Sequence, residues 1–199
     1  WVSMPPVEAR LTRALLDRFF GPETAAWARF REAPAAKHYH QAYAGGLLEH
    51  TISVAHAVSA AANFFPGIDR EIAVTGALLH DIGKTEAYND DPLAIEMTDS
   101  GRLQAEIPLG YYKVRRQIEE IDGFDPDLAQ AVLHIILSHH GQLEHGSPVV
   151  PCTREATDSL DARVLLVGRQ PRLMHRELRP GEADAGLVGR DVHEEELQQ

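Results

Sequence analysis

The stretch Ile72-Ala73-Val74-Thr75-Gly76-Ala77-Leu78-Leu79-His80-Asp81-Ile82-Gly83-Lys84-Thr85 is the part of the sequence that most strongly predicts the fold. Its first eight residues are apolar on nearly all sides, which is typical of a buried helix, and Asp69 just before them is a suitable N-cap. A charged Asp buried beside a His is strongly unfavourable unless another group pairs with it. We therefore expect a divalent metal at His80-Asp81. We also expect the helix to end at Gly83, so that Lys84 stands just beyond it and meets an anion.

The composition limits the class of protein. The chain has 199 residues, of which 44% are hydrophobic and 25% charged, and this fits one globular domain. The single cysteine, Cys152, excludes an internal disulfide framework and a thiolate zinc cluster, and it indicates a reducing compartment. We therefore expect a cytoplasmic protein, and no apolar run is long enough to predict contact with a membrane.

The net charge of −11 argues against broad electrostatic binding of nucleic acid. It does not exclude a single strand that enters a pocket in which metal ions supply positive charge. The expected partner is thus a single-stranded nucleic acid or a nucleotide substrate. Formation of a homo-oligomer stays open.

Apolar residues at helical spacing predict an all-α bundle of about six or seven helices, because no segment shows convincing strand alternation. Besides the buried helix, we expect helices at about 7–20, 22–32, 47–64, 107–121, 126–139 and 154–167. The polar stretch 85–102 is expected to be a loop. Residues 1–168 are predicted to form one domain, and the acidic, glycine-interrupted residues 169–199 a poorly ordered tail.

Histidines and acids gather near the expected helix ends. The candidate metal ligands are His50, His80, Asp81, Glu106, His139, His140 and one of Asp158 and Asp161. Imidazole and carboxylate without thiolate suit Mn, Fe, Co, Ni, Zn or Mg. Because the set exceeds the needs of one cation, two ions with Asp81 as a bridge are favoured. His56 and His134 point elsewhere along their helices, so we expect them to be a surface and a structural residue.

Two divalent ions can hold the attacking and the leaving oxygen of a phosphoester displacement, so that no Ser or Cys nucleophile is needed. Lys84 could hold a non-bridging phosphate oxygen as a point charge. Asp81 and Lys84 are therefore the predicted catalytic residues. The segment 37–46, rich in His and aromatic residues and closed by a Gly pair, is either a loop that approaches the substrate or a packed connector. On the first interpretation, His40 and Tyr43 contact substrate.

Four segments resemble the HD-domain metal-dependent phosphohydrolases, and most closely the HD domain of YhaM-type 3′–5′ exoribonucleases. They are HYHQAYAGGLLEHT (38–51), LLHDIGKT (78–85), ILSHHGQLEHGSPVVP (136–151) and EA…DSLDAR (155–163). The resemblance covers about residues 7–167 and implies an all-α HD fold, divalent metal ions and hydrolysis of phosphodiesters at the ends of RNA or single-stranded DNA. A similar HAYxGGL segment occurs in HD domains of conjugative relaxases, so the substrate does not follow from it.

The resemblance also implies a role for single residues. His50, His80, Asp81 and the late aspartate would hold the first metal, while Asp81, His139 and His140 would hold the second. Lys84 would contact the phosphate.

This chain departs from the family pattern at three places. Ala105-Glu106-Ile107 stands where the family usually has Gly-His-Ile, and a Glu ligand would change the metal preference. The last helix is about five residues short before Asp158, which alters the face that the aspartate occupies; we assign Asp158 as the ligand. The OB domain that precedes HD in the exoribonucleases is absent, and a chain that begins with Trp1 is consistent with a fragment.

Three functions follow as hypotheses. The first is a 3′–5′ exonuclease acting on RNA or single-stranded nucleic-acid ends. The second is a phosphohydrolase of small or cyclic nucleotides, which the negative charge and the absent OB domain favour. The third is a degenerate HD domain that binds nucleic acid or a partner protein without turnover, which Glu106 and the short last helix favour.

Overall fold

The computed structural model describes residues 6–37, 41–89, 91 and 94–159. These residues form the helices α1 Pro6–Phe20, α2 Ala25–Phe30, α3 Gly46–Ala61, α4 Arg70–Leu79, α5 Lys84–Ala87, α6 Asp99–Gln104, α7 Glu106–Glu119 and α8 Pro126–Ser138, and a 3₁₀ turn at Leu143–His145. Residues 154–159 are also helical. The described residues contain no strand and one isolated bridge, between Tyr88 and Met97. The all-α prediction is confirmed.

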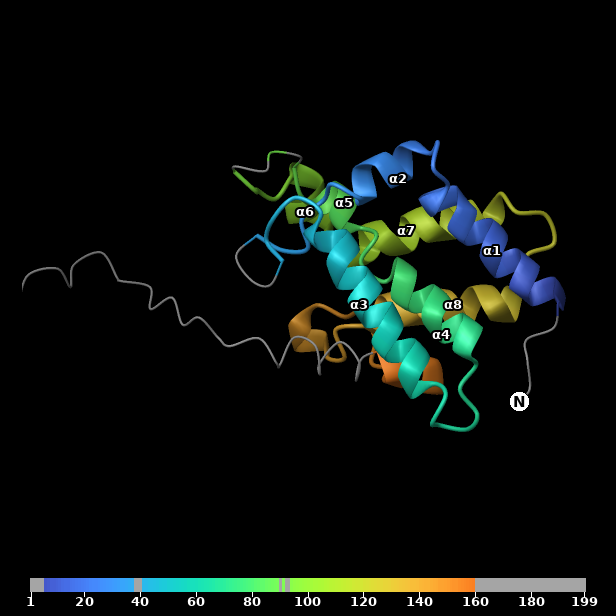
Figure 1. Ribbon diagram of the computed structural model, residues 1–199. Coiled ribbons are helices and arrows are strands. Elements are labelled where there is room, and N and C mark those ends of the chain that lie inside the picture. The colour runs from blue at the N-terminus through green and yellow to red at the C-terminus, as the bar shows by residue number, and fades with distance from the viewer. Residues whose placement is uncertain (1–5, 38–40, 90, 92–93, 160–199) are drawn as a thin grey trace, which may run out of the picture.

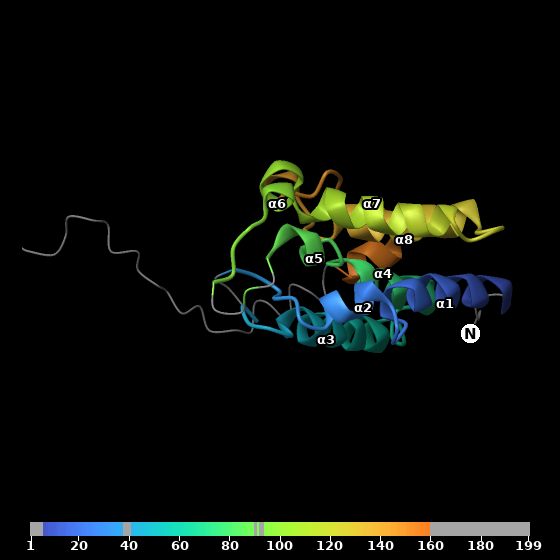
Figure 2. The same ribbon diagram turned by 90° about the horizontal axis from the view of Figure 1, so that it is seen from above.

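Helix α4 lies at the centre of the bundle and packs against α1, α3 and α8 (Figure 1). Seen from above, α7 and α8 lie on one side of α4 and α1 and α3 lie on the other (Figure 2). The C-terminal end of α4, where His80 and Asp81 follow, is therefore enclosed by helices from distant parts of the sequence. None of the helices in the described part of the chain combines the length and apolar character that crossing a bilayer requires.

Small residues allow α4 to occupy this central place. Ala73 and Ala77 are fully buried. A Cβ built on Gly76 would lie 2.4 Å from Cδ1 of Ile135, so a larger residue would push α8 away. Close packing of this kind brings α4 and α8, which carry candidate ligands, into direct contact.

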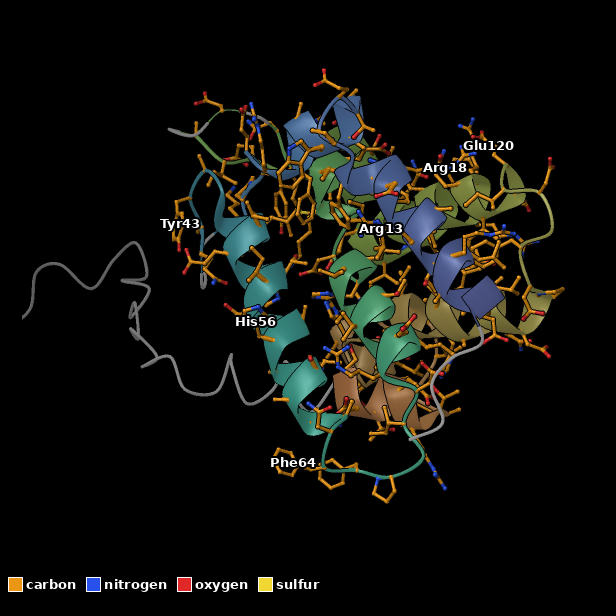
Figure 3. All side chains as sticks on the ribbon, turned by 45° about the vertical axis from the view of Figure 1, so that its right-hand side comes forward. Arg13, Arg18, Tyr43, His56, Phe64 and Glu120 are labelled. Atoms are coloured by element: carbon orange, nitrogen blue, oxygen red, sulfur yellow. The ribbon has the colours of Figure 1, made fainter. Side chains whose placement is uncertain are left out.

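A larger apolar cluster surrounds the other side of the bundle. It joins α1, α2, α7 and α8 to Leu79 and Ile82, which flank the His-Asp pair. At the rim, Nη1 of Arg18 lies 2.8 Å from Oε2 of Glu120 and links α1 to the end of α7 (Figure 3). The two residues on either side of His80-Asp81 are thus anchored in the core, which fixes the position of the pair.

Polar side chains cap several helix starts, and Asp69 does so as predicted. Asp69 accepts hydrogen bonds from the N–H groups of Glu71 and Ile72, at 2.9 and 3.1 Å. Asp125 accepts one from Leu128 at 2.8 Å, and the hydroxyl of Thr153 accepts one from Ala156 at 3.2 Å. These side chains satisfy N–H groups that lack a partner inside the helix.

Two expectations about the segment after α4 were wrong. The helix ends at Leu79 rather than at Gly83, and Gly83 instead precedes α5, of which Lys84 is the first residue. The stretch 85–102 is no simple loop, because α5 and α6 lie within it. Thr98 explains the start of α6, since its hydroxyl accepts a hydrogen bond from the N–H of Gly101 at 3.0 Å.

The helix that the sequence predicted at 22–32 is shorter than expected. It corresponds to α2, which starts at Ala25, after the N-cap Thr24.

Replacing Gly83 by Ala tests whether the turn after α4 depends on close backbone contact. A Cβ there would lie 1.9 Å from the carbonyl oxygen of Glu106 and 2.5 Å from the backbone nitrogen of Gly110, so α5 and α7 would have to separate. We expect the free energy of unfolding, measured by urea denaturation, to fall by about 3 kcal/mol. Gly123→Ala is the control: its φ of 69° is unfavourable for Ala but nothing lies within 4 Å, so about 1 kcal/mol is expected. Equal losses for both variants would contradict the packing argument.

Candidate metal centre

The carboxylate of Asp81 is the centre of a buried polar cluster. The residue is 1% exposed. Its Oδ2 lies 3.4 Å from Nε2 of His50 and 3.2 Å from Nε2 of His80. Its Oδ1 lies 3.3 Å from Nε2 of His139. Nζ of Lys84 donates a hydrogen bond to Oδ2 at 2.7 Å. Three imidazoles and one ammonium group therefore converge on a single carboxylate.

Helix ends bring these imidazoles together. His50 belongs to the first turns of α3, while His80 and His139 are the C-cap residues of α4 and α8. The last carbonyls of a helix have no partner within it. Nδ1–H of His80 donates to the carbonyl of Ala77 at 2.6 Å, and Nδ1–H of His139 donates to the carbonyl of Ile136 at 2.7 Å. Both bonds leave Nε2 as the ring nitrogen that faces Asp81.

The hydrogen bond to the carbonyl of Ile136 fixes the tautomer of His139. Burial lowers the pKa of His139 from 6.5 to about 3, so the ring is neutral and its only proton lies on Nδ1. Nε2 of His139 and Oδ1 of Asp81 then face each other with a lone pair on each atom and no hydrogen between them. Neither atom makes a hydrogen bond to a described residue. Burial of two acceptors in this way is unfavourable unless a cation lies between them.

The charge of Asp81 persists in this setting. Burial alone would raise the pKa of the carboxyl, but the nearby His80 and Lys84 outweigh burial and hold the pKa well below its ordinary value. Asp81 is therefore ionised and can serve as a metal ligand at neutral pH.

Two groups of candidate ligand atoms share Asp81. One comprises His50, His80 and Asp81, and the other comprises Asp81, His139 and His140; within each group the ligand atoms lie within 4.8 Å of one another. Imidazole nitrogens with carboxylate oxygens are a donor set that divalent transition metals accept. The geometry thus fits metal ions on both sides of Asp81.

His140 is oriented by the loop that follows α8. Its Nδ1–H donates to the carbonyl of His145 at 2.6 Å, and its backbone N–H donates to the hydroxyl of Ser147 at 2.9 Å. Sequence reasoning did not identify these two supporting residues, because a backbone carbonyl acceptor has no sequence signature. Ser147 is 2% exposed, a burial that only the structure reveals.

Glu106 lies beside the second group. Its Oε1 is 3.6 Å from Nε2 of His140, and it is the first residue of α7. The preceding residue, Ala105, has φ 61° and ψ 164°, a backbone conformation that is costly for any residue with a Cβ. The structure therefore holds Glu106 at the edge of the cluster at the expense of local strain.

The other sequence candidates lie in different surroundings. Tyr43 is on the outer surface near the start of α3 (Figure 3), and its hydroxyl donates to the carboxylate of Glu49. His40 and Asp161 lie outside the described residues. Asp158 is buried but belongs to neither of the two ligand groups, so its metal role stays a prediction.

The structure confirms the predictions that His56 is a surface residue and that His134 is a structural one. His56 is exposed on α3 (Figure 3). His134 is structural, because its Nε2 accepts a hydrogen bond from the backbone N–H of Cys152 at 2.9 Å and thereby ties the loop after α8 to the helix.

Comparison with known proteins supports the resemblance drawn from the sequence. The HD domain family matches residues 47–179. The chain is 33% identical over 178 residues to the 3′-5′ exoribonuclease YhaM of Bacillus pumilus, an alignment that covers 87% of this chain and 52% of that protein. It is 33% identical over 147 residues to the 3′-5′ exoribonuclease YhaM of Bacillus subtilis, covering 71% of this chain and 46% of that protein.

The chain therefore spans about half the length of the curated relatives it matches. No solved structure gives a significant match.

Metal ions should stabilise the fold through Asp81. Adding Mn²⁺ to metal-stripped protein, at about 100 times its dissociation constant, should raise the free energy of unfolding by about 2.7 kcal/mol. Asp81→Asn should abolish the rise, because Asp81 is common to both ligand groups. His56→Ala, which removes an exposed His from α3, should behave like the parent chain in the same denaturation assay. An undiminished rise in Asp81→Asn would place the binding site elsewhere.

The metal-free protein should lose stability in mild acid through His139. Because the pKa of His139 is about 3 in the folded protein and 6.5 ordinarily, only the unfolded chain takes up this proton between those values. The stability that the neutral ring contributes is fully present above about pH 6.5. It decreases as the pH is lowered, by about 1.4 kcal/mol per pH unit. His139→Gln should make the slope between about pH 4.5 and 6 shallower by that amount in urea titrations. Equal slopes for the parent chain and for His139→Gln would show that His139 is already protonated in the folded protein over this pH range, and would contradict the prediction.

Proposed function

Because the chain belongs to the HD domain family, we propose that it is a metal-dependent phosphodiesterase that removes nucleotides from the 3′ ends of RNA or other single-stranded nucleic acid. The observation that carries the proposal is the position of Asp81, which is shared by two groups of candidate metal ligands. A carboxylate common to two cations is a recurrent feature of centres that hydrolyse phosphoesters.

We assign the ligands on this geometry. His50, His80 and Asp81 would hold one ion, with Asp158 as the further predicted ligand. Asp81, His139 and His140 would hold the other. Glu106, whose Oε1 faces His140, stands where the resemblance places a His and would bring a harder oxygen donor to the second ion. We expect this donor to shift the preference toward Mn or Mg relative to an all-histidine site.

Bound divalent ions would acidify a water molecule and neutralise charge on the phosphate. The protein contributes the arrangement around them. The bonds from Nδ1 of His80 and His139 to backbone carbonyls keep Nε2 directed inward, so the lone pairs need no reorganisation when ligands bind. Lys84 is 6% exposed and paired with Asp81 at the centre of the cluster, and we propose that it binds a non-bridging oxygen of the phosphate.

The choice of 3′ ends rests on the relatives. Curated proteins that are 30–33% identical to this chain are named 3′-5′ exoribonucleases. Similarity over about half of their length supports a shared chemistry at the HD domain, and the activity on RNA is our extension from it.

A metal-supplemented hydrolysis panel tests the proposal. The substrates are 5′-labelled single-stranded RNA, single-stranded DNA, cyclic nucleotides and free nucleotides, each with Mn, Fe, Co, Ni or Mg. We expect 5′-labelled RNA to shorten progressively from its 3′ end with release of mononucleotides. His80→Ala should lower the rate by about 100-fold or more, because a lost ligand costs at least as much as a lost supporting residue. His56→Ala should keep the parental rate.

One observation favours a second candidate, a phosphohydrolase of small or cyclic nucleotides. The net charge of −11 disfavours a long polyanion and is less unfavourable for a single nucleotide. Turnover of cyclic or free nucleotides without shortening of RNA would establish this candidate and overturn the exonuclease. Absence of turnover of every substrate by metal-loaded protein would overturn both.

A further inference from the structure

The ring of His140 is oriented in a different way from the rings of His80 and His139. These two donate from Nδ1–H to carbonyls three residues earlier, in the last turns of their own helices. His140 lies beyond the end of α8, and its Nδ1–H donates to the carbonyl of His145, five residues later in the chain. The orientation of His140 therefore depends on the fold of the loop that follows, whereas the other two rings are oriented by helix ends.

This loop, residues 141–147, closes on itself. The backbone N–H groups of His145 and Ser147 both donate to the carbonyl of Gln142, at 3.1 and 3.3 Å. Gly146, between them, has φ 94°, a left-handed conformation that is costly for a residue with a Cβ. The chain thereby turns back toward the end of α8.

Ser147 ties the loop to the residue that carries the candidate ligand. Its Oγ accepts a hydrogen bond from the backbone N–H of His140 at 2.9 Å, and the residue is 2% exposed. Two contacts from one loop thus hold His140, one at its backbone from Ser147 and one at its ring from the carbonyl of His145.

The second ligand group, to which His140 belongs, lies closer to solvent than the first. The side chains of His140 and Glu106, whose Nε2 and Oε1 are 3.6 Å apart, are 14% and 20% exposed. The side chains of His50 and His80 in the first group are 3% and 1% exposed. Enclosure in the core therefore fixes the first group, and the second needs additional support at its open side.

We propose that Ser147 is a positioning residue for His140, and that the loop 141–147 thereby sets the affinity of the second metal ion. The inference rests on the proposed two-ion phosphodiesterase centre. Because the loop orders the imidazole during folding, the ion does not have to order it on binding. The first ion is independent of this loop, since its ligands lie on α3 and at the end of α4.

The variant Ser147→Ala removes the hydroxyl without adding volume. Isothermal titration of the metal-stripped parent chain with Mn²⁺ should show two binding steps. Ser147→Ala should raise the Kd of one step by about 10- to 100-fold, the effect of losing a group that supports a metal ligand, and leave the other Kd unchanged. At a Mn²⁺ concentration that fills both parental sites, the variant should give the electron paramagnetic resonance signal of isolated Mn²⁺ in place of that of a coupled pair.

Two further variants separate the parts of the loop. His145→Ala keeps the carbonyl that orients His140 and removes only an exposed imidazole, so both Kd values should equal those of the parent chain. Gly146→Ala keeps the hydroxyl of Ser147 and strains the left-handed turn, where the nearest atom to the new Cβ is Nδ1 of His140 at 3.9 Å. It should raise the same Kd that Ser147→Ala raises. Loss of one ion in His145→Ala would make that imidazole a ligand and contradict the assignment of its carbonyl.

Ser53→Ala is the matched control. Ser53 lies on α3, where its hydroxyl donates to the carbonyl of Glu49 at 2.8 Å, and its loss should change neither Kd. The unfolding midpoint of the metal-free protein shows whether each variant folds, and Gly146→Ala decides the question if Ser147→Ala does not fold.

Three results would overturn the inference. They are parental Mn²⁺ binding in Ser147→Ala, equal weakening of both steps, which would assign Ser147 to the fold as a whole, and a single binding step in the parent chain. If the metal-loaded parent chain hydrolyses no phosphodiester, the proposed function fails, while the two Kd values still decide the role of Ser147.

Discussion

The structure depends on one unfavourable placement, an ionised carboxylate buried at the point where four segments meet. Asp81 cannot keep its charge there through solvation, so it needs Lys84 and the imidazoles around it. The imidazoles in turn present lone pairs that a proton or a metal must satisfy. A buried cluster in this state is poorly suited to holding the fold together by itself, and this is the physical reason to assign it to binding metal ions.

The bundle is built to make this placement possible. Ala73, Gly76 and Ala77 let α4 run through the middle of the molecule, so that its end delivers His80 and Asp81 to the interior. Helix ends supply free carbonyls, and two of the imidazoles use them to orient their rings. The backbone of α4 and α8 therefore positions the candidate ligands as much as the side chains do.

The sequence was sufficient to predict the helical class, most helix starts and the residues that surround Asp81. Helix periodicity and capping residues act locally, and the order of His50, His80-Asp81 and the late acids carries the resemblance to HD domains. Other features depend on tertiary contact. The close approach of Gly83, just before α5, to the backbone of α7 has no local signal in the sequence, and neither has the strained Ala105 that precedes Glu106. The face of Asp158 depends on the shortened last helix, which spacing alone does not resolve.

The central claim is that Asp81 lies between two metal ions, and a crystal structure of the Mn²⁺-soaked protein tests it most directly. Anomalous difference maps should show two peaks, one beside His50 and His80 and the other beside His139 and His140, with Asp81 in contact with both. Peaks only at other places, or a map without a peak at Asp81 when the ion is bound in solution, would contradict the claim.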